Sequence, residues 1–132
     1  MKIYKSIGKI QRNLVVKKEK ENPYFKSKYA DINMILELLY PQLEKEGLTL
    51  SQPLTTIDGK PAIKTIITDG TEKIEEITLI PDLQDAQKMG SVITYFRRYS
   101  LVSIFGLMTE EDDDGNLASG KEVKEKIPTI EL

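Results

Sequence analysis

The 132-residue sequence predicts an α+β fold: a three-stranded antiparallel β-meander (β-β-β-α core) packed against a long helix, with N-terminal helices. Three observations predict it. Apolar residues recur at helical spacing before residue 47 and after residue 83, Thr- and Ile-rich segments fill the stretch between, and Asp-Gly pairs separate those segments. Because a domain typically holds about 100–200 residues, one core is expected.

The first segment has the pattern of an amphipathic helix. Apolar residues recur at spacings of four, three and four, at Ile3, Ile7, Ile10 and Leu14. Basic residues repeat similar spacings about half a turn away, at Lys2, Lys5, Lys9 and Arg12. One face is expected to pack on the core, and the other is either a solvated Lys face or a surface for an anionic partner. Residues 21–31 contain Asn-Pro and are expected to form a loop.

A second helix is expected to begin after Asp31, which has the side chain of an N-cap, and to end at Gly47. Its apolar stripe consists of Ile32, Ile35, Leu36, Leu39 and Leu43. Proline lacks a backbone N–H, so Pro41 predicts a kink or a restart near Tyr40.

The hydrophobic period then changes to that of strands. Segments 48–57, 61–68 and 71–80 are rich in Thr and Ile, and the pairs Asp58-Gly59 and Asp69-Gly70 separate them. Asp-Gly between such segments is a strong hairpin signal because both residues tolerate a positive φ. The pattern therefore predicts a three-stranded meander.

A long helix is expected over residues 83–107, with two distinct faces. The predicted core face holds Met89, Ile93, Phe96, Ser100 and Ser103. The predicted polar face holds Gln87, Ser91, Thr94 and Arg98. Gly90 weakens the helix by about 1 kcal/mol relative to Ala, which suggests close approach of its backbone to the sheet or to a ligand.

The net charge of −2 conceals a strong asymmetry along the chain. Residues 1–28 carry nine basic and two acidic side chains, whereas residues 109–132 carry three basic and eight acidic ones. The expected organisation is a domain over residues 1–108 and an acidic flexible tail over residues 109–132.

The composition excludes several kinds of chemistry. The chain has no Cys and no His, which removes disulfides, thiol nucleophiles, His-containing triads and an imidazole base. No Walker lysine motif or nucleophile elbow is present. We expect no enzymatic activity, and the absence of a long apolar run predicts a soluble, intracellular protein.

Two short segments combine cations with aromatic rings, at residues 24–29 and 95–99. Single-stranded nucleic acid suits such clusters, because Lys and Arg bind phosphates and unstacked bases lie on aromatic faces. The alternative is that Phe96, with one of Tyr95 and Tyr99, belongs to the core. Adjacent helical residues differ by about 100°, so one of Arg97 and Arg98 can bind phosphate while the other pairs with a carboxylate. The spacing favours Arg98 as the phosphate ligand, because it continues the polar stripe of Gln87, Ser91 and Thr94.

The acidic run Glu110–Asp114 invites a metal interpretation. As an EF-hand loop it lacks the glutamate at position twelve, where Lys121 stands, so a calcium loop is rejected. A two-metal nuclease needs carboxylates spread over several rigid elements. A solvated acidic linker and an electrostatic role, limiting non-specific DNA binding or contacting a basic partner, both remain open.

Four segments, residues 22–32, 46–52, 85–101 and 105–116, resemble the ERF (essential recombination function) family of phage single-strand annealing proteins. The most specific is the block G-S-x-I-T-Y-x-R-R-Y-x-L followed by the acidic cluster. The implied fold is similar to that of the eukaryotic ring-forming recombination annealing protein. Phe96 stands where members commonly carry Ala, and many members continue into a longer C-terminal region.

The resemblance implies a bacteriophage or prophage recombinase that binds single-stranded DNA and anneals complementary strands without ATP. It implies DNA contacts at Lys26, Lys28, Tyr29, Gln87, Ser91, Thr94, Arg97 and Arg98. It also implies a homo-oligomer, as a ring or filament, in the cytoplasm of a bacterial host, with a single-strand-binding protein or phage exonuclease as a candidate partner. No cofactor is expected; Mg²⁺ is compatible with the sequence but not required by it.

Three alternatives stay open from the sequence. The first is a module that binds single strands without annealing them. The second is a metal-dependent nuclease that uses the acidic run. The third is a structural or adaptor protein in which Arg97 and Arg98 only form salt bridges.

Overall fold

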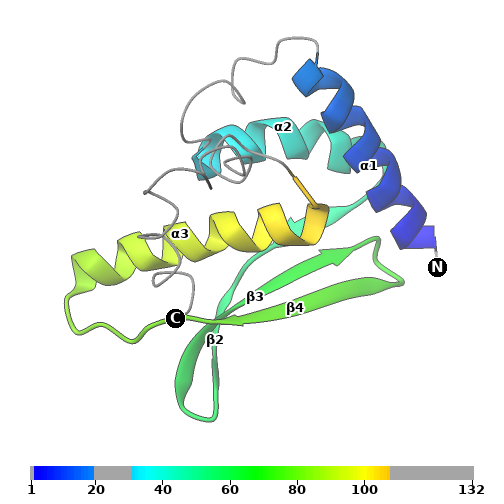
Figure 1. Ribbon diagram of the computed structural model, residues 1–132. Coiled ribbons are helices and arrows are strands. Elements are labelled where there is room, and N and C mark those ends of the chain that lie inside the picture. The colour runs from blue at the N-terminus through cyan, green and yellow to red at the C-terminus, as the bar shows by residue number, and fades with distance from the viewer. Residues whose placement is uncertain (1, 20–30, 108–132) are drawn as a thin grey trace, which may run out of the picture.

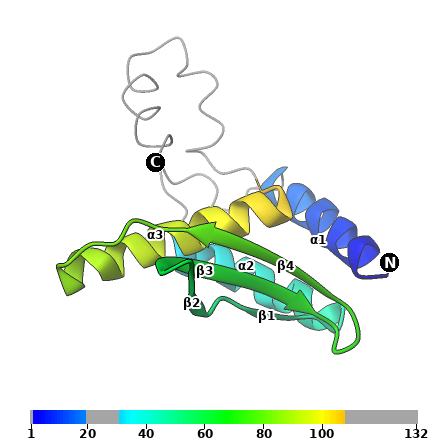
Figure 2. The same cartoon turned by 90° about the horizontal axis from the view of Figure 1, so that it is seen from below.

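The computed structural model describes residues 2–19 and 31–107. In chain order the elements are α1 (Lys2–Glu19), α2 (Ile32–Lys45), β1 (Thr49–Ser51), β2 (Leu54–Ile57), β3 (Lys60–Thr68), β4 (Lys73–Leu79) and α3 (Ala86–Phe105). The three helices lie on one face of an antiparallel sheet, and no helix of the described residues covers the other face (Figures 1 and 2). The α+β class is therefore confirmed.

The sheet has four strands, so the expectation of three is wrong. β3 lies in the centre, β4 pairs with one edge of it, and β1 and β2 lie end to end along the other edge. β1 and β2 share one register on β3, because Ser51 pairs with Ile66 and Leu54 with Ile63. They are two halves of the predicted first strand, interrupted at residues 52 and 53.

The interruption has a simple chemical cause. The Lys64 N–H still donates to the Pro53 carbonyl oxygen at 2.9 Å. Proline has no N–H with which to make the return bond of an antiparallel pair, so the ladder loses one hydrogen bond there. The Gln52 side chain next to this gap reaches α3 on the helix side of the sheet, where its amide donates to the Arg97 carbonyl oxygen.

Both Asp-Gly pairs form turns as predicted. Asp58 and Gly59 have φ angles of 52° and 77°, and they connect β2 directly to β3 as a two-residue hairpin loop. The second loop is longer, spanning residues 69–72, with Gly70 at φ 96°.

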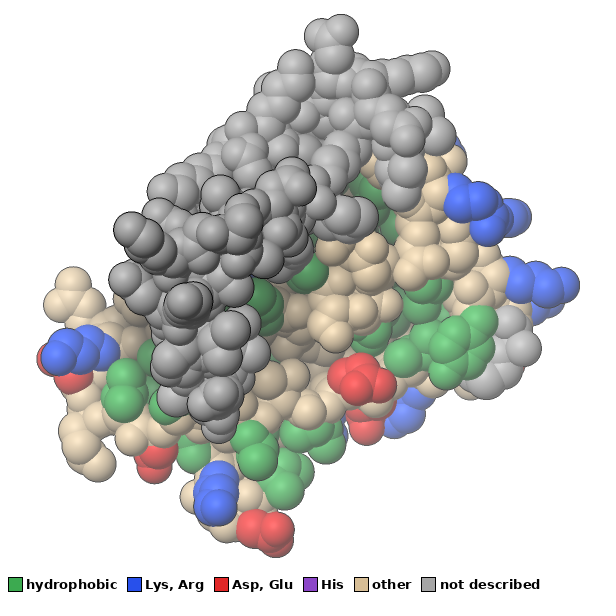
Figure 3. All heavy atoms as spheres, viewed as in Figure 1, with side chains coloured by type: hydrophobic (Ala, Val, Ile, Leu, Met, Phe, Trp, Pro, Cys, Tyr) green, Lys and Arg blue, Asp and Glu red, His purple; other side chains and the backbone are tan. Residues whose placement is uncertain are grey.

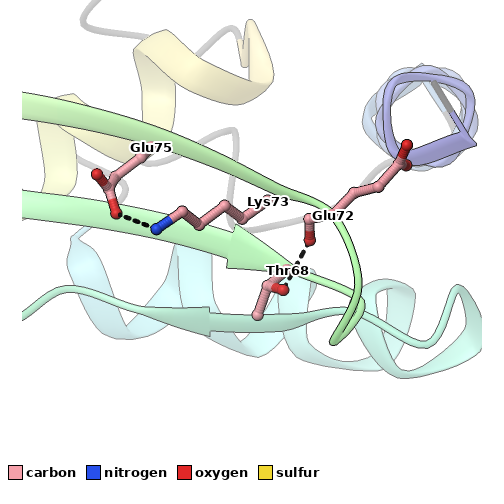
Figure 4. Close-up of polar contacts among 4 residues, drawn as sticks. All are labelled: Thr68, Glu72, Lys73 and Glu75. Atoms are coloured by element: carbon pink, nitrogen blue, oxygen red, sulfur yellow. Dashed lines mark hydrogen bonds and ion pairs between the residues drawn. The ribbon is translucent and has the colours of Figure 1, made fainter.

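Side-chain hydrogen bonds close the longer turn (Figure 4). The Thr68 hydroxyl donates to the Glu72 carbonyl oxygen at 2.7 Å. The backbone N–H groups of Glu72 and Thr71 donate to the Asp69 carboxylate and hold its pKa below the ordinary value. Beyond the turn, an ion pair of 3.2 Å joins Lys73 to Glu75 on the open face of the sheet.

The core lies between the helices and the inner face of the sheet. The predicted stripe of α1 is confirmed, since Ile3, Ile7, Ile10 and Leu14 are all buried. They pack with the apolar residues of α2, with Ile67 and Ile74 of the sheet, and with the C-terminal end of α3. Polar side chains join the elements around this core: Gln11 donates to the Phe105 carbonyl oxygen at 2.8 Å, and Asn13 donates to Gln42 at 3.0 Å.

The second helix begins and ends where the sequence predicts. The Asp31 carboxylate accepts from the Met34 N–H at 2.9 Å, and Gly47 follows the helix with φ 69°. The expected restart near Tyr40 does not occur, because α2 runs through Pro41 as one element. Pro41 lies on the exposed side, together with Glu37, so water can hydrogen-bond the carbonyl that the proline leaves without a helical donor.

The predicted core face of α3 is only partly correct. Ser100 is buried, but Met89, Ile93 and Phe96 are half-buried and Ser103 is exposed. The fully buried side chains are Leu101 and Phe105, near the C-terminal end. The cause is tertiary: the N-terminal half of α3 extends past the other helices (Figure 1), so core burial is concentrated in its C-terminal half.

Asp85→Ala should destabilise the protein. The Asp85 carboxylate caps α3 by accepting from the N–H groups of Gln87 and Lys88 at 2.8 and 3.0 Å. Loss of such a cap costs about 1 kcal/mol of unfolding free energy. Urea titration followed by circular dichroism measures the unfolding free energy. The control is Asp82→Ala, which removes the same charge from the same loop between β4 and α3. Equal stability of the two variants would contradict the capping role.

Candidate functional site

A hollow of about 580 Å³ opens where α3 passes the start of α2. We call it the polar hollow. Its lining residues come from the N-terminal end of α2 and from four successive turns of α3: Asp31, Ile32, Gln87, Gly90, Ser91, Thr94, Tyr95 and Arg98. The hollow is thus formed by the part of α3 that extends beyond the core.

The structure brings together four of the predicted site residues. Gln87, Ser91, Thr94 and Arg98 were assigned to one polar helix face from their spacing, and all four line the polar hollow. The first three are exposed, and the Ser91 hydroxyl lies 3.4 Å from the Gln87 carbonyl oxygen, to which it donates. The hollow therefore presents an amide and two hydroxyl groups to any ligand.

Arg98 supplies the cationic group of the polar hollow. The residue is 7% exposed, and its guanidinium carbon lies 5.2 Å from the centre of the Tyr99 ring. Packing against an aromatic ring holds a guanidinium in place while leaving its charge intact. A cation held in this way at the floor of a hollow interacts with an anion more strongly than one on a mobile exposed side chain.

Arg97 points toward the sheet instead. Its Nε donates to Gln52 Oε1 at 3.2 Å, and Gln52 Nε2 donates to the Arg97 carbonyl oxygen at 3.2 Å. The same Gln52 nitrogen lies 3.0 Å from the hydroxyl of the buried Thr65. Gln52 therefore connects α3 to the central strand, and this contact sets the rotation of α3 about its axis at Arg97 and Arg98.

Sequence reasoning missed Gln52. A local signal was present, because Pro53 predicts a missing ladder bond at that point of the strand. The direction in which the Gln52 side chain turns, and its partner 45 residues later in the chain, depend on how α3 packs on the sheet.

The structure does not describe the other residues that the sequence singled out. Lys26, Lys28 and Tyr29, and the acidic run Glu110–Asp114, lie outside the described residues. Within residues 2–19 and 31–107, no group of three or more acidic side chains is placed so that it could hold a metal ion. Neither α1, α2 nor α3 is both long and apolar enough to cross a membrane.

Comparison with known proteins places this fold in a family. The ERF superfamily matches residues 3–129 of the chain, which is nearly its full length. The chain belongs to the ERF superfamily. The match includes nearly all of α1, the whole sheet and α3, so the polar hollow lies inside the matched region.

A curated relative agrees with this assignment. The chain is 28% identical over 119 residues to the Essential recombination function protein of Salmonella phage P22. The alignment covers 84% of this chain and 58% of the relative, so the chain spans little more than half the length of that protein. No solved structure matches the chain.

Gly90→Ala should stabilise the protein by about 0.5–1 kcal/mol. No atom lies within 4 Å of a Cβ placed at Gly90, so the expected close approach to the sheet is wrong, and Ala is the better helix former. Gly106→Ala is the contrasting variant: Gly106 has φ 63°, and a Cβ there would lie 3.1 Å from the Gln11 side chain. Thermal unfolding measures the melting temperature of each variant. We expect it to rise above that of the wild type in Gly90→Ala and to fall below it in Gly106→Ala. A Gly90→Ala protein that melts below wild type would show that the backbone at Gly90 is constrained.

Proposed function

We propose that this protein is a phage recombination protein that binds single-stranded DNA and pairs complementary strands without ATP. The observation that supports it best is the polar hollow, where a buried guanidinium lies beside exposed amide and hydroxyl groups on one helix face. Membership of the ERF superfamily and similarity to the phage P22 recombination protein point in the same direction.

The chemistry of the polar hollow suits a phosphodiester backbone. Arg98 supplies the positive charge, and Gln87 and Thr94 supply neutral hydrogen-bond donors for phosphate oxygens; the Ser91 hydroxyl between them becomes a further donor when it turns away from the Gln87 carbonyl oxygen. None of these groups needs to contact a base edge. Binding would therefore depend little on DNA sequence, as a protein that anneals arbitrary strands requires.

The affinity of a single hollow should be low. Asp31 also lines the hollow, and its carboxylate opposes the charge of Arg98. Several weak sites around a homo-oligomer would hold many nucleotides together, while each contact stays exchangeable when a complementary strand arrives. Strand pairing involves no covalent step, so the proposal includes neither a nucleotide cofactor nor a required metal ion. The expected place of action is the cytoplasm of a bacterial host.

The test is an annealing assay with two complementary labelled oligonucleotides across a salt series, with oligomer size measured in parallel. We expect pairing to be faster with protein and affinity to fall as salt rises, because bound phosphates release counterions. Slower pairing would indicate a module that protects single strands and would overturn the annealing proposal. Shortened DNA in the presence of Mg²⁺ would indicate a nuclease instead.

Ser91→Asp should weaken binding to single-stranded DNA by about tenfold, because it places a second carboxylate in the polar hollow next to the phosphate site. Ser91 is exposed, so the substitution leaves the core intact. The matched control is Ser51→Asp, the same change at an exposed residue of β1 that pairs with Ile66 on the open face of the sheet. Equal losses in both variants would show that the charge acts through the whole protein and would contradict the assigned site.

The two arginines should differ in their effect on salt dependence. Arg98→Ala should lower the slope of log affinity against log salt by about one, because one phosphate contact is lost. Arg97→Ala should leave that slope unchanged and lower the stability instead, because it breaks the bond from Arg97 Nε to Gln52. Fluorescence anisotropy measures the slopes, and urea unfolding measures the stabilities. A reduced slope in Arg97→Ala alone would reverse the assignment of the two roles.

A further inference from the structure

A second and larger hollow, of about 750 Å³, lies between α1, β4 and α3. Four aromatic residues line it: Tyr4 of α1 and Tyr95, Phe96 and Tyr99 of α3. We call it the aromatic hollow. Its volume lies in the range of pockets that bind small organic groups, about 300–1,000 Å³. No role has been given to this hollow in the site described above.

The rings suit a flat ligand. Tyr95 meets Phe96 and Tyr99 edge to face, with ring centres 5.2 and 4.7 Å apart. This arrangement fixes the rings without stacking them on one another, and although the Arg98 guanidinium lies over the Tyr99 ring, the rings of Tyr95 and Phe96 keep surface for a further planar group. Tyr4 of α1 lines the same hollow and is 59% exposed, so its ring is accessible to a ligand.

The charges set the orientation of the ligand. Glu76 of β4 lines the hollow, so its carboxylate disfavours a phosphate inside. A cation lies at the rim, since a Cβ at Gly8 would lie only 3.5 Å from Arg12 Nη1, and Gly8 itself lines the hollow. Basic side chains continue along the outer side of α1, at the right-hand edge of the molecule in Figure 3. A ligand with a flat neutral group and an attached anion therefore fits with the flat group inward.

The two hollows share one lining residue. Tyr95 lines both the polar hollow and the aromatic hollow. A strand whose backbone crosses Arg98 therefore reaches the aromatic hollow within the same turn of α3. Only a single strand has unstacked bases available for such a pocket, whereas duplex bases are stacked on each other.

We infer that the aromatic hollow binds one unstacked base of the same single strand, with the phosphate of that nucleotide at Arg12 on the rim. The inference rests on the proposed function and extends it, because it makes α1 part of the DNA-binding surface and adds a contact to the bases. Stacking on aromatic side chains tolerates every base, so this contact adds affinity without requiring a particular sequence.

The experiment compares an oligonucleotide with an abasic strand of equal length, which keeps every phosphate and lacks every base. Wild-type protein should bind the intact strand at least about fivefold more tightly. Tyr4→Ala should reduce this ratio and leave the affinity for the abasic strand unchanged. Tyr40→Ala is the matched control, since Tyr40 is 53% exposed on α2 and lines neither hollow; it should change neither affinity.

A second variant tests the proposed phosphate contact of Arg12 at the rim of the aromatic hollow. Arg12→Ala should weaken binding of both strands and lower the salt slope by about one, because Arg12 would bind phosphate and not the base.

The outcomes separate this inference from the function on which it rests. Equal wild-type affinities for the two strands would overturn the base pocket and leave single-strand binding intact. Failure to bind either strand would overturn both. A Tyr4→Ala protein with altered oligomer size and an unchanged ratio would assign the aromatic hollow to a contact with a second copy of the chain and would overturn the inference.

Discussion

Leu101 and Phe105 of α3 are fully buried against residues from α1, α2 and the central strand, and the remaining features of the molecule depend on this contact. Hydrophobic burial at one end of a 20-residue helix fixes that end and leaves the other free of the core. The N-terminal half of α3 consequently lies beside the sheet and the start of α2 with its polar face open. Both hollows lie along this helix.

The contact to the sheet then determines what each arginine does. Gln52 sits at the interruption of the first strand and bonds both to Thr65 in the sheet and to Arg97 in the helix. Because adjacent helical residues point about 100° apart, holding Arg97 against the sheet turns Arg98 into the polar hollow. A glutamine of the first strand thus helps to orient the guanidinium that follows Arg97 in the helix.

Under the proposed function, the charges at the two hollows predict weak DNA binding by each copy of the chain. A cation and a carboxylate lie at each hollow: Arg98 and Asp31 line the polar hollow, whereas Glu76 lines the aromatic hollow and Arg12 lies next to Gly8 at its rim. A strongly basic groove would hold a strand too tightly for exchange, whereas near-neutral sites rely on several subunits acting together. This balance suits the proposed annealing function, in which a strand is held and then released to a complementary one.

The sequence by itself determined the local elements. Periodicity located the helices, Asp31 marked the start of one of them, and the Asp-Gly pairs marked the turns, because these signals act within a few residues. Spacing also placed Gln87, Ser91, Thr94 and Arg98 on one face. Only the tertiary structure decided which half of α3 is buried, that Arg97 and Arg98 point to different surfaces, and that Tyr4 and Tyr95 line the same hollow. Those facts depend on contacts between residues far apart in the chain, and no local pattern encodes them.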